Sequence, residues 1–294
     1  MRTLTQPGPV QPSRYDSFAG NPQALDFTLA PGLSLNEALT APLVAAGLQS
    51  ATVSFGGGTL APFHYVMPGP PDSALHVAYF TAPRAPAGET RVDAANATFG
   101  WDEGKPYVHI HGAWTAADGT RHGGHMLPHE CIVAREMPAR AWGFTTIRMA
   151  TAADPETNFT LFQPTVQLPP IARFQSTTLD QSPGPSAANT RGVFARIRPN
   201  EDISLAVEAV AQRHGLRDAA VRGSLGSLIG ARFADGRAVP DLATEVLVRR
   251  GAVRDGVAEL EMLVADMQGN VHEGLLVRGE NPVLITFDLV LETL

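Results

Sequence analysis

Short runs of apolar residues, many ending at glycine or proline, alternate with polar positions along most of the chain. In the first half this pattern predicts a strand over 24–29, a helix from a cap at Ser34 to a stop at Gly47, and a strand over 51–55. A further stretch, 141–150, suits an edge strand. The first half therefore reads as strands flanked by one helix.

The same order of elements returns after residue 191. The segment NEDISLAVEAVAQRHGL is amphipathic, with Asn200 or Asp202 as its cap and Gly215 as its stop, and a strand is predicted over 219–222. The pattern thus predicts an α/β (α+β) fold with two similar domains, each a mainly antiparallel sheet with a flanking helix.

Between these helices, residues 107–130 read YVHIHGAWTAADGTRHGGHMLPHE and contain five of the nine histidines. Their apolar alternation and the Ala-Asp-Gly at 117–119 predict a hairpin whose loop glycine, Gly119, has positive φ. Ala116 then pairs with Thr120, which fixes the register of both strands.

Under that register His111 lies directly opposite His125, and His109 lies two residues along on the same face, whereas His122 lies on the other face. Opposed residues have Cβ atoms roughly 4.5–5.5 Å apart, so three imidazoles can converge on one ion. Zinc is the default ion for three neutral nitrogen ligands, with an open fourth position. The alternative is a dry cluster of stacked strand histidines.

The two halves also match residue by residue. GLQSATVSFGGGTL at 47–60 matches GLRDAAVRGSLGSL at 215–228, an offset of 168 residues from Gly47 to Gly215. At the hairpin the offset is 150 residues, from Gly119 to Gly269, so the first copy carries an extra Pro/Gly-rich loop. The chain is predicted to be an internal duplication.

The histidine cluster is not repeated in the second copy. Glu259, Glu261 and Leu275 stand where the first copy has its three histidines. Histidines present in only one copy are better explained by a site than by the fold.

These observations divide the chain into four parts. We expect an N-terminal arm over 1–13, a first domain over 14–150 with the histidine hairpin, a connector over 151–190 rich in Pro, Ser, Thr and Asn, and a second domain over 191–294.

The composition of the chain limits which classes of partner it can bind. A formal net charge of −7 disfavours nucleic acid, and no apolar run has the length of a membrane span. Cys131 is the only cysteine, so no intrachain disulfide or thiolate metal cage can form. We expect a cytoplasmic location.

Other residues carry weaker chemical signals. Glu130 and His64 are candidate proton carriers, although a structural hydrogen bond explains Glu130 equally well. Arg222, Ser224 and Ser227 lie in a glycine-rich segment and could bind an anion, but a tight connection between strands is the simpler interpretation.

The motifs described above resemble those of a known family. KPYVHIHGAWTAADGTRHGGHM and the preceding helix and GLQSATVSFGG resemble the plants-and-prokaryotes-conserved (PPC) domain, and RPNEDI…GLRDAAVRGSLGSLIGA…LVADMQGNVHEGLL resembles a diverged second copy. The resemblance implies an α/β domain that assembles as a trimer, here a homotrimer. Plant members bind DNA through an Arg-Gly-Arg-Pro motif, which this sequence lacks.

Two classes of function follow. The first is a metal-dependent hydrolase or lyase that acts on a small anionic or carbonyl-bearing metabolite. The second is a PPC-type regulatory or DNA-binding module without enzymatic activity.

Overall fold

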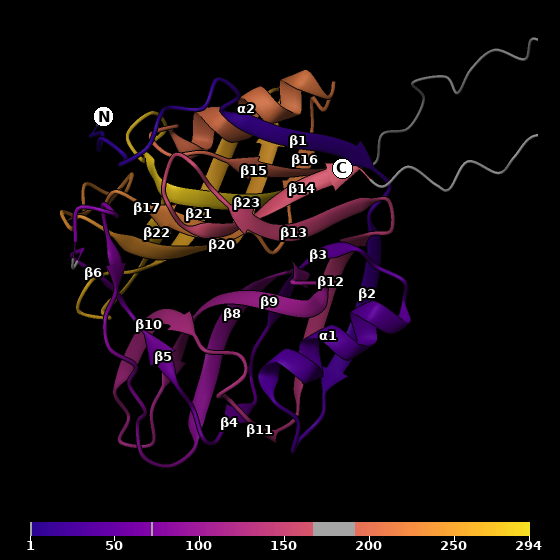
Figure 1. The fold of residues 1–294 in the computed structure, drawn as a ribbon, viewed down its shortest axis with the longest axis vertical. Helices are drawn as coiled ribbons and strands as arrows, with labels where there is room; N and C mark the ends of the chain where they lie inside the picture. The colour runs from indigo at the N-terminus through magenta and orange to yellow at the C-terminus, as the bar shows by residue number, and fades with distance from the viewer. Residues whose placement is uncertain (1, 72, 167–191) are drawn as a thin grey trace, which may run out of the picture.

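The computed structural model describes residues 2–71, 73–166 and 192–294 and contains two large sheets, each flanked by one helix (Figure 1). Most strand pairs are antiparallel, as the sequence pattern predicts. No helix within these ranges is long and apolar enough to cross a membrane.

The first sheet runs in the order β2-β12-β3-β8-β9-β10-β5, with further strands attached at its sides. Its strands are β2 (Gln23–Leu29), β3 (Ser50–Phe55), β4 (Thr59–Leu60), β5 (Tyr65–Val66), β8 (Thr90–Asp102), β9 (Lys105–Thr115), β10 (Arg121–Met126), β11 (Val133–Arg135), β12 (Met137–Phe144), β13 (Ile147–Ala153) and β14 (Thr160–Val166).

The second sheet runs in the order β1-β15-β23-β16-β20-β21-β22, with β17 attached to β20 and β23. Its strands are β1 (Tyr15–Gly20), β15 (Gly192–Ile197), β16 (Ala219–Val221), β17 (Leu225–Leu228), β20 (Thr244–Arg254), β21 (Val257–Ala265), β22 (Val271–Leu275) and β23 (Val283–Thr293). Two small hairpins complete the fold: β6 (Pro68–Gly69) with β7 (Tyr79–Phe80), and β18 (Ala231–Arg232) with β19 (Ala238–Val239).

Each helix begins and ends where its sequence predicts. Helix α1 (Leu35–Ala45) follows Ser34, whose side chain accepts from the backbone of Glu37, while Glu37 reaches back to the Ser34 N–H. Helix α2 (Ile203–Arg213) follows Asp202, which caps it by accepting from the N–H of Leu205. Both helices bury an apolar face against their own sheet.

The two halves share one topology. The order β2-β12-β3-β8-β9-β10 in the first sheet corresponds strand by strand to β15-β23-β16-β20-β21-β22 in the second, and the helix follows the first strand in each. Two similar domains with sheets and a flanking helix are therefore confirmed.

The sheets depart from the expected ranges in two places. Strand β1, within the range 14–150 expected for the first domain, pairs with β15 of the second sheet. The range 151–190, expected to be an irregular connector, contains the end of β13 and all of β14, while residues 167–190 lie outside the described residues. Local sequence cannot identify a partner strand, because pairing partners are set by long-range packing.

The structure also differs from the single edge strand expected over 141–150. The chain forms two strands there, and the first of them, β12, lies inside the sheet between β2 and β3. The second, β13, pairs with β14 and continues toward the second domain. A sequence pattern of alternating burial does not distinguish an edge strand from an interior one.

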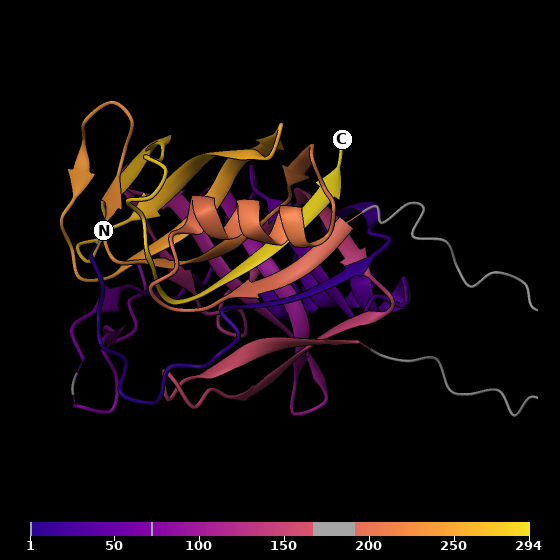
Figure 2. The same ribbon diagram turned by 90° about the horizontal axis from the view of Figure 1, so that it is seen from above.

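The two domains pack against each other through β8, β9 and β10 on one side and β17, β20 and β21 on the other (Figures 1 and 2). The buried side-chain amide of Asn96 donates to the carbonyls of Ser224 (3.1 Å) and Val248 (3.0 Å). Ala113 of the first domain packs with Leu225 and Leu247 of the second. The first domain's histidine hairpin therefore faces the second domain.

The N-terminal segment crosses to the second domain as well. Leu4 exchanges two hydrogen bonds of 2.9 Å with the side chain of Asn200, and the buried amide of Gln6 donates to Leu284 (2.8 Å). The N-terminal segment is therefore held against the second domain by these hydrogen bonds.

A histidine cluster in the cavity between the domains

The histidine hairpin has the register that its sequence predicts. His111 lies opposite His125, the N–H of Ala116 donates to Thr120 (2.9 Å), and Gly119 has a φ of +86°. A side chain at Gly119 would be strained in this left-handed conformation, so glycine fixes the turn and the turn fixes the pairing.

Three imidazoles converge on one face of this hairpin. The ring centroids of His109 and His111 lie 4.5 Å apart, those of His109 and His125 lie 4.9 Å apart, and one ring nitrogen from each lies within 4.8 Å of the others. Two nitrogens bound to one tetrahedral zinc ion at about 2.0–2.1 Å lie about 3.4 Å apart. The rings would therefore have to move closer together to share an ion.

The second domain orients one of these rings. Nδ1 of His111 lies 3.2 Å from the carbonyl oxygen of Val246, which can only accept, so Nδ1 carries the proton in this contact. Nε2 of the same ring lies 2.8 Å from Oε2 of Glu245. Both ring nitrogens of His111 thus face acceptors, as in a protonated ring, and an ion could bind at Nε2 only in place of the proton there.

The charges of the cluster are strongly coupled. Burial lowers the pKa of His109 well below its ordinary value, and it lowers the pKa of His125 to about 4. Burial also opposes the charge on His111, but Glu245, together with the Val246 carbonyl, outweighs it and raises the pKa of His111. Two of the three rings are therefore neutral at pH 7, the form that binds metal.

The side chains of the cluster are chemically suited to bind a metal ion. Nδ1 of His125 is buried and has no hydrogen-bond partner among the described residues. Leaving a buried polar atom without a partner costs about 1–3 kcal/mol, which a bound ion can offset. Within the described ranges these three histidines form the one group of metal-ligating side chains close enough to share an ion.

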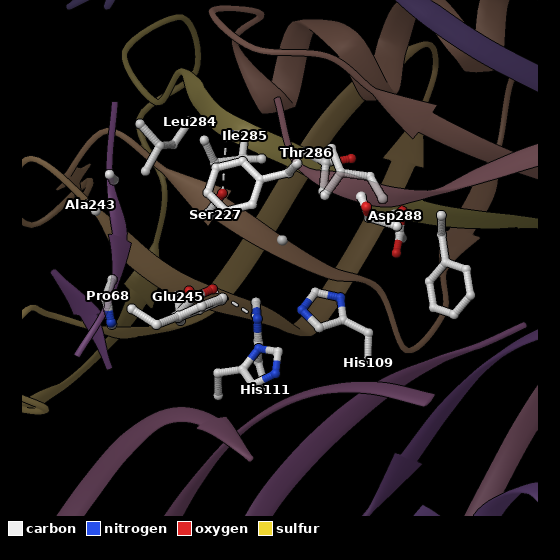
Figure 3. A pocket seen from close by; sticks show the side chains of 18 of the residues that line it. Pro68, His109, His111, Ser227, Ala243, Glu245, Leu284, Ile285, Thr286 and Asp288 are labelled. Atoms are coloured by element: carbon white, nitrogen blue, oxygen red, sulfur yellow. Dashed lines mark hydrogen bonds and ion pairs between the residues drawn. The ribbon is translucent and has the colours of Figure 1, made fainter. Parts of the chain in front are cut away.

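The histidines line a cavity of about 240 Å³ between the domains (Figure 3). At roughly 30 Å³ for each water molecule this is room for about eight waters, or for one small organic molecule. The cavity wall is apolar on the side formed by Ala243, Leu284 and Ile285, and aromatic at Phe80 and Phe159. Polar groups are concentrated around the histidines, as in ligand sites generally.

The second domain contributes a second carboxylate to the cavity, close to the cluster. Asp288, on β23, is 2% exposed and lines the same cavity as His109 (Figure 3). Burial raises the pKa of Asp288 to about 6, against the opposite effects of Thr98, Arg196 and His111. Its Oδ1 has no hydrogen-bond partner among the described residues.

The structure separates the candidate proton carriers from the cluster. His64 and Glu130 do meet, since Nδ1 of His64 lies 2.9 Å from the Glu130 carbonyl oxygen, but neither lines the cavity. Cys131 lies beside them, fully buried, and burial raises the pKa of its thiol to about 12. The thiolate that nucleophilic chemistry requires is therefore disfavoured there.

The three candidate anion ligands do not come together either. The guanidinium of Arg222 pairs with Glu292 (2.8 Å), and the Ser224 hydroxyl accepts from Val290 and donates to Arg222. Ser227 lines the cavity, and its hydroxyl accepts from the N–H of Ile285 (3.2 Å). The glycine-rich segment is not a tight connection between strands, because Leu225–Leu228 form β17, which pairs with β20 and β23 and brings Ser227 to the cavity.

Glu245 and Asp288 are the cavity residues that the sequence patterns miss. Each is a single charged residue inside an apolar strand, in TEVLV and in VLITFDLVL. A lone carboxylate at such a position is costly to bury unless it has a partner or a role, and this was the available signal.

Comparison with known proteins identifies the second domain. Residues 184–294 match the sequence profile of the Plants and Prokaryotes Conserved (PCC) domain, the family abbreviated PPC above. The second half of this chain is thus similar to a PPC domain over its whole length. The first domain repeats the strand order of the second, as an internal duplication predicts. A search of curated proteins finds no match.

Solved structures share parts of this fold at low identity. A metal-containing protein from Archaeoglobus fulgidus is 15% identical, with 51% of this chain and 97% of that chain covered and a TM-score of 0.41. A PPC protein from Pyrococcus horikoshii is 14% identical (54% and 99% covered, TM-score 0.40). A candidate DNA-binding protein from Ralstonia eutropha is 18% identical (47% and 89% covered, TM-score 0.37). Each covers about half of this chain.

Proposed function

We propose that this protein binds one divalent metal ion through His109, His111 and His125 and that the adjoining cavity receives a small-molecule substrate. The observation that carries the proposal is the convergence of three imidazoles within 4.8 Å, two of them neutral, at the wall of a cavity. Zinc is the ion that three imidazoles suit by default.

The chain's own groups suit a hydrolase or lyase. A bound zinc ion would supply a Lewis acid and bring the pKa of a coordinated water to roughly 7. Glu245 lies 2.8 Å from the ligand nitrogen of His111 and is the carboxylate placed to accept a proton beside it. One side of the cavity is apolar, which lowers the local polarity around the reacting groups.

The test is elemental analysis of untagged protein, beside the variant His111→Ala. We expect one zinc ion per chain in the unaltered protein and a loss of at least tenfold in bound metal in the variant. His129→Ala removes an exposed histidine outside the cavity and serves as the control, with unchanged metal. Equal metal in all three proteins, or none in any, would contradict the proposal.

A second candidate is a regulatory or DNA-binding module without turnover. Similarity of the second domain to the PPC family favours it, and two of the solved structures, from Ralstonia eutropha and Bacteroides thetaiotaomicron, carry DNA binding as a candidate function in their names. The net charge of −7 opposes it. Gel-shift titration of mixed-sequence duplex DNA at low salt distinguishes the two: binding at or below micromolar concentration would favour the module.

We also propose a homotrimer, on the family resemblance. The edge strands give this proposal no separate support, because β5 covers β10 in the first domain and residues 232–237 cover the end of β22 in the second, where the N–H of Ala234 donates to the carbonyl of Leu275 (2.8 Å). Light scattering of the eluted protein at micromolar concentration should give three times the chain mass, and a monomer would exclude this assembly.

A further inference from the structure

The cavity wall has an unusual charge balance for a site expected to take an anionic metabolite. Two carboxylates line it, Glu245 and Asp288, and no lysine or arginine does so among the residues that the structure describes. In the protein without a bound metal ion, an anion would meet these carboxylates with no lysine or arginine to offset them. An anionic ligand is therefore disfavoured in that state.

Asp288 is the carboxylate in this wall that has an oxygen without a partner. It is 98% buried, and its Oδ1 makes no hydrogen bond within the described residues. The Thr98 hydroxyl lies beside this carboxyl group and, as a hydrogen-bond donor, opposes the rise of its pKa. A buried carboxylate oxygen that faces a cavity without a donor is a place where a ligand can donate one.

The neighbouring cation does not satisfy Asp288. Arg196 stands opposite Asp288 across two paired strands, but it donates to Asp154 (2.8 Å) and to the Thr286 hydroxyl (3.1 Å) and does not line the cavity. Glu245 is different, because His111 already lies beside it. Asp288 thus remains the free acceptor.

Aromatic rings complete the surroundings. Tyr107 and Phe162 line the cavity together with Tyr79, Phe80 and Phe159. Aromatic faces attract organic cations through the negative charge of the ring face, most strongly where the cation is desolvated. An ammonium group with an apolar body would therefore find a carboxylate, ring faces and an apolar wall in one cavity.

We propose that the cavity binds a small organic amine in its ammonium form, with Asp288 accepting from the ammonium group and the aromatic and aliphatic wall holding the apolar body. This inference names the substrate class for the cavity of the proposed function. It places the recognition group on the second domain, close to the histidine cluster on the first.

The test uses three probes of similar size: benzylamine, benzyl alcohol and benzoate. Binding is measured by calorimetry at pH 7.5 on chelator-treated protein, so that no probe can coordinate a metal. We expect benzylammonium to bind about tenfold or more tightly than benzyl alcohol, and benzoate to bind most weakly.

Asp288→Asn keeps the shape of the side chain and removes its charge, and it should reduce benzylammonium affinity about tenfold or more. Asp255→Asn, which removes an exposed carboxylate outside the cavity, is the matched control and should leave the affinity unchanged. Tighter binding of benzoate than of benzylammonium, or unchanged affinity in Asp288→Asn, would overturn the inference. Because these measurements omit metal, they fail or succeed independently of the zinc content of the histidine cluster.

Discussion

The two hairpins of this chain, β9–β10 and β21–β22, have the same pairing but face different surroundings. His111 pairs with His125 in the first, and Glu261 pairs with Leu275 at the corresponding place in the second. The first pair is buried under the second domain, whereas Leu275 is 43% exposed. The hairpin supplies the spacing of a site, and the domain that covers the hairpin supplies its burial and its charges.

The second domain is therefore more than a diverged copy that supports the first. Val246 orients the ring of His111, Glu245 sets its charge, and Asp288 lines the same cavity. The copy that lost the histidines contributes the carboxylates. We therefore test the difference between the two hairpins in two ways. Some substitutions weaken the contacts that the second domain makes with the first, and others move the histidines to the second hairpin.

The largest change in the free energy of unfolding should come from substitution of Asp154, whose side chain links the hairpin β13–β14 to the second sheet. Its carboxylate pairs with Arg196 (2.8 Å) and Arg198 (2.9 Å), and Arg196 and Asp154 are fully buried. Asp154→Ala leaves two arginines without their shared partner and should lower the free energy of unfolding by about 3–5 kcal/mol.

Urea unfolding measures this change. The exposed pair of Arg217 and Asp255 provides the control, since Asp255→Asn should cost no more than about 1 kcal/mol. A loss below about 1 kcal/mol in Asp154→Ala would mean that the hairpin is held to the second domain in some other way.

The next largest change concerns the pH dependence of stability, because Asp288 is buried and its ionised form destabilises the folded chain. Its pKa in the folded chain is about 6, above the ordinary value of 3.8, so the folded state holds this proton more tightly than the unfolded state. The stabilising contribution is complete below about pH 4 and is lost as the pH rises through 6.

Asp288→Asn removes this dependence. In metal-free and ligand-free protein the variant should be more stable than the unaltered chain by about 1–3 kcal/mol above pH 7, and this advantage should shrink as the pH falls toward 4. Urea midpoints at pH 4, 5, 6 and 7.5 test it, and an advantage of the variant that is constant over this range would contradict it.

The smallest effect should come from moving the histidines. Glu259→His, Glu261→His and Leu275→His, introduced together with His111→Ala, rebuild the register of the first hairpin in the second copy. Zinc affinity measured by competition with a chromogenic chelator should be at least about tenfold below that of the unaltered chain, because no second domain covers the new face. Equal affinity would mean that register alone makes the site.

Local sequence was sufficient for the histidine cluster and for both helices. Glycine at the turn fixes the register, and Ser34 and Asp202 fix the helix starts through hydrogen bonds with residues three positions away. Such features depend on neighbours in the chain and can be worked out from their order.

The cavity could not be worked out in that way. Glu245 meets His111 from a strand more than a hundred residues later, and Asp288 comes from the last strand of the chain. The pairing of β1 with β15 and the interior place of β12 have the same cause, since each depends on which surfaces pack together after the strands have formed.

The pairing of β1 with β15 has a consequence for how the chain folds during its synthesis. Gly20 pairs with Gly192, so 172 further residues must be made after Gly20 before its partner is complete (192 − 20). At roughly 5–20 residues per second, β1 leaves the ribosome about 10–30 s before its partner exists. The first domain can fold in that interval, while the strand made before it waits unpaired, with its backbone groups open to other chains. Slow synthesis or crowding of nascent chains should therefore expose this protein to aggregation at its N-terminal end, even though that end is a well-paired strand in the finished molecule.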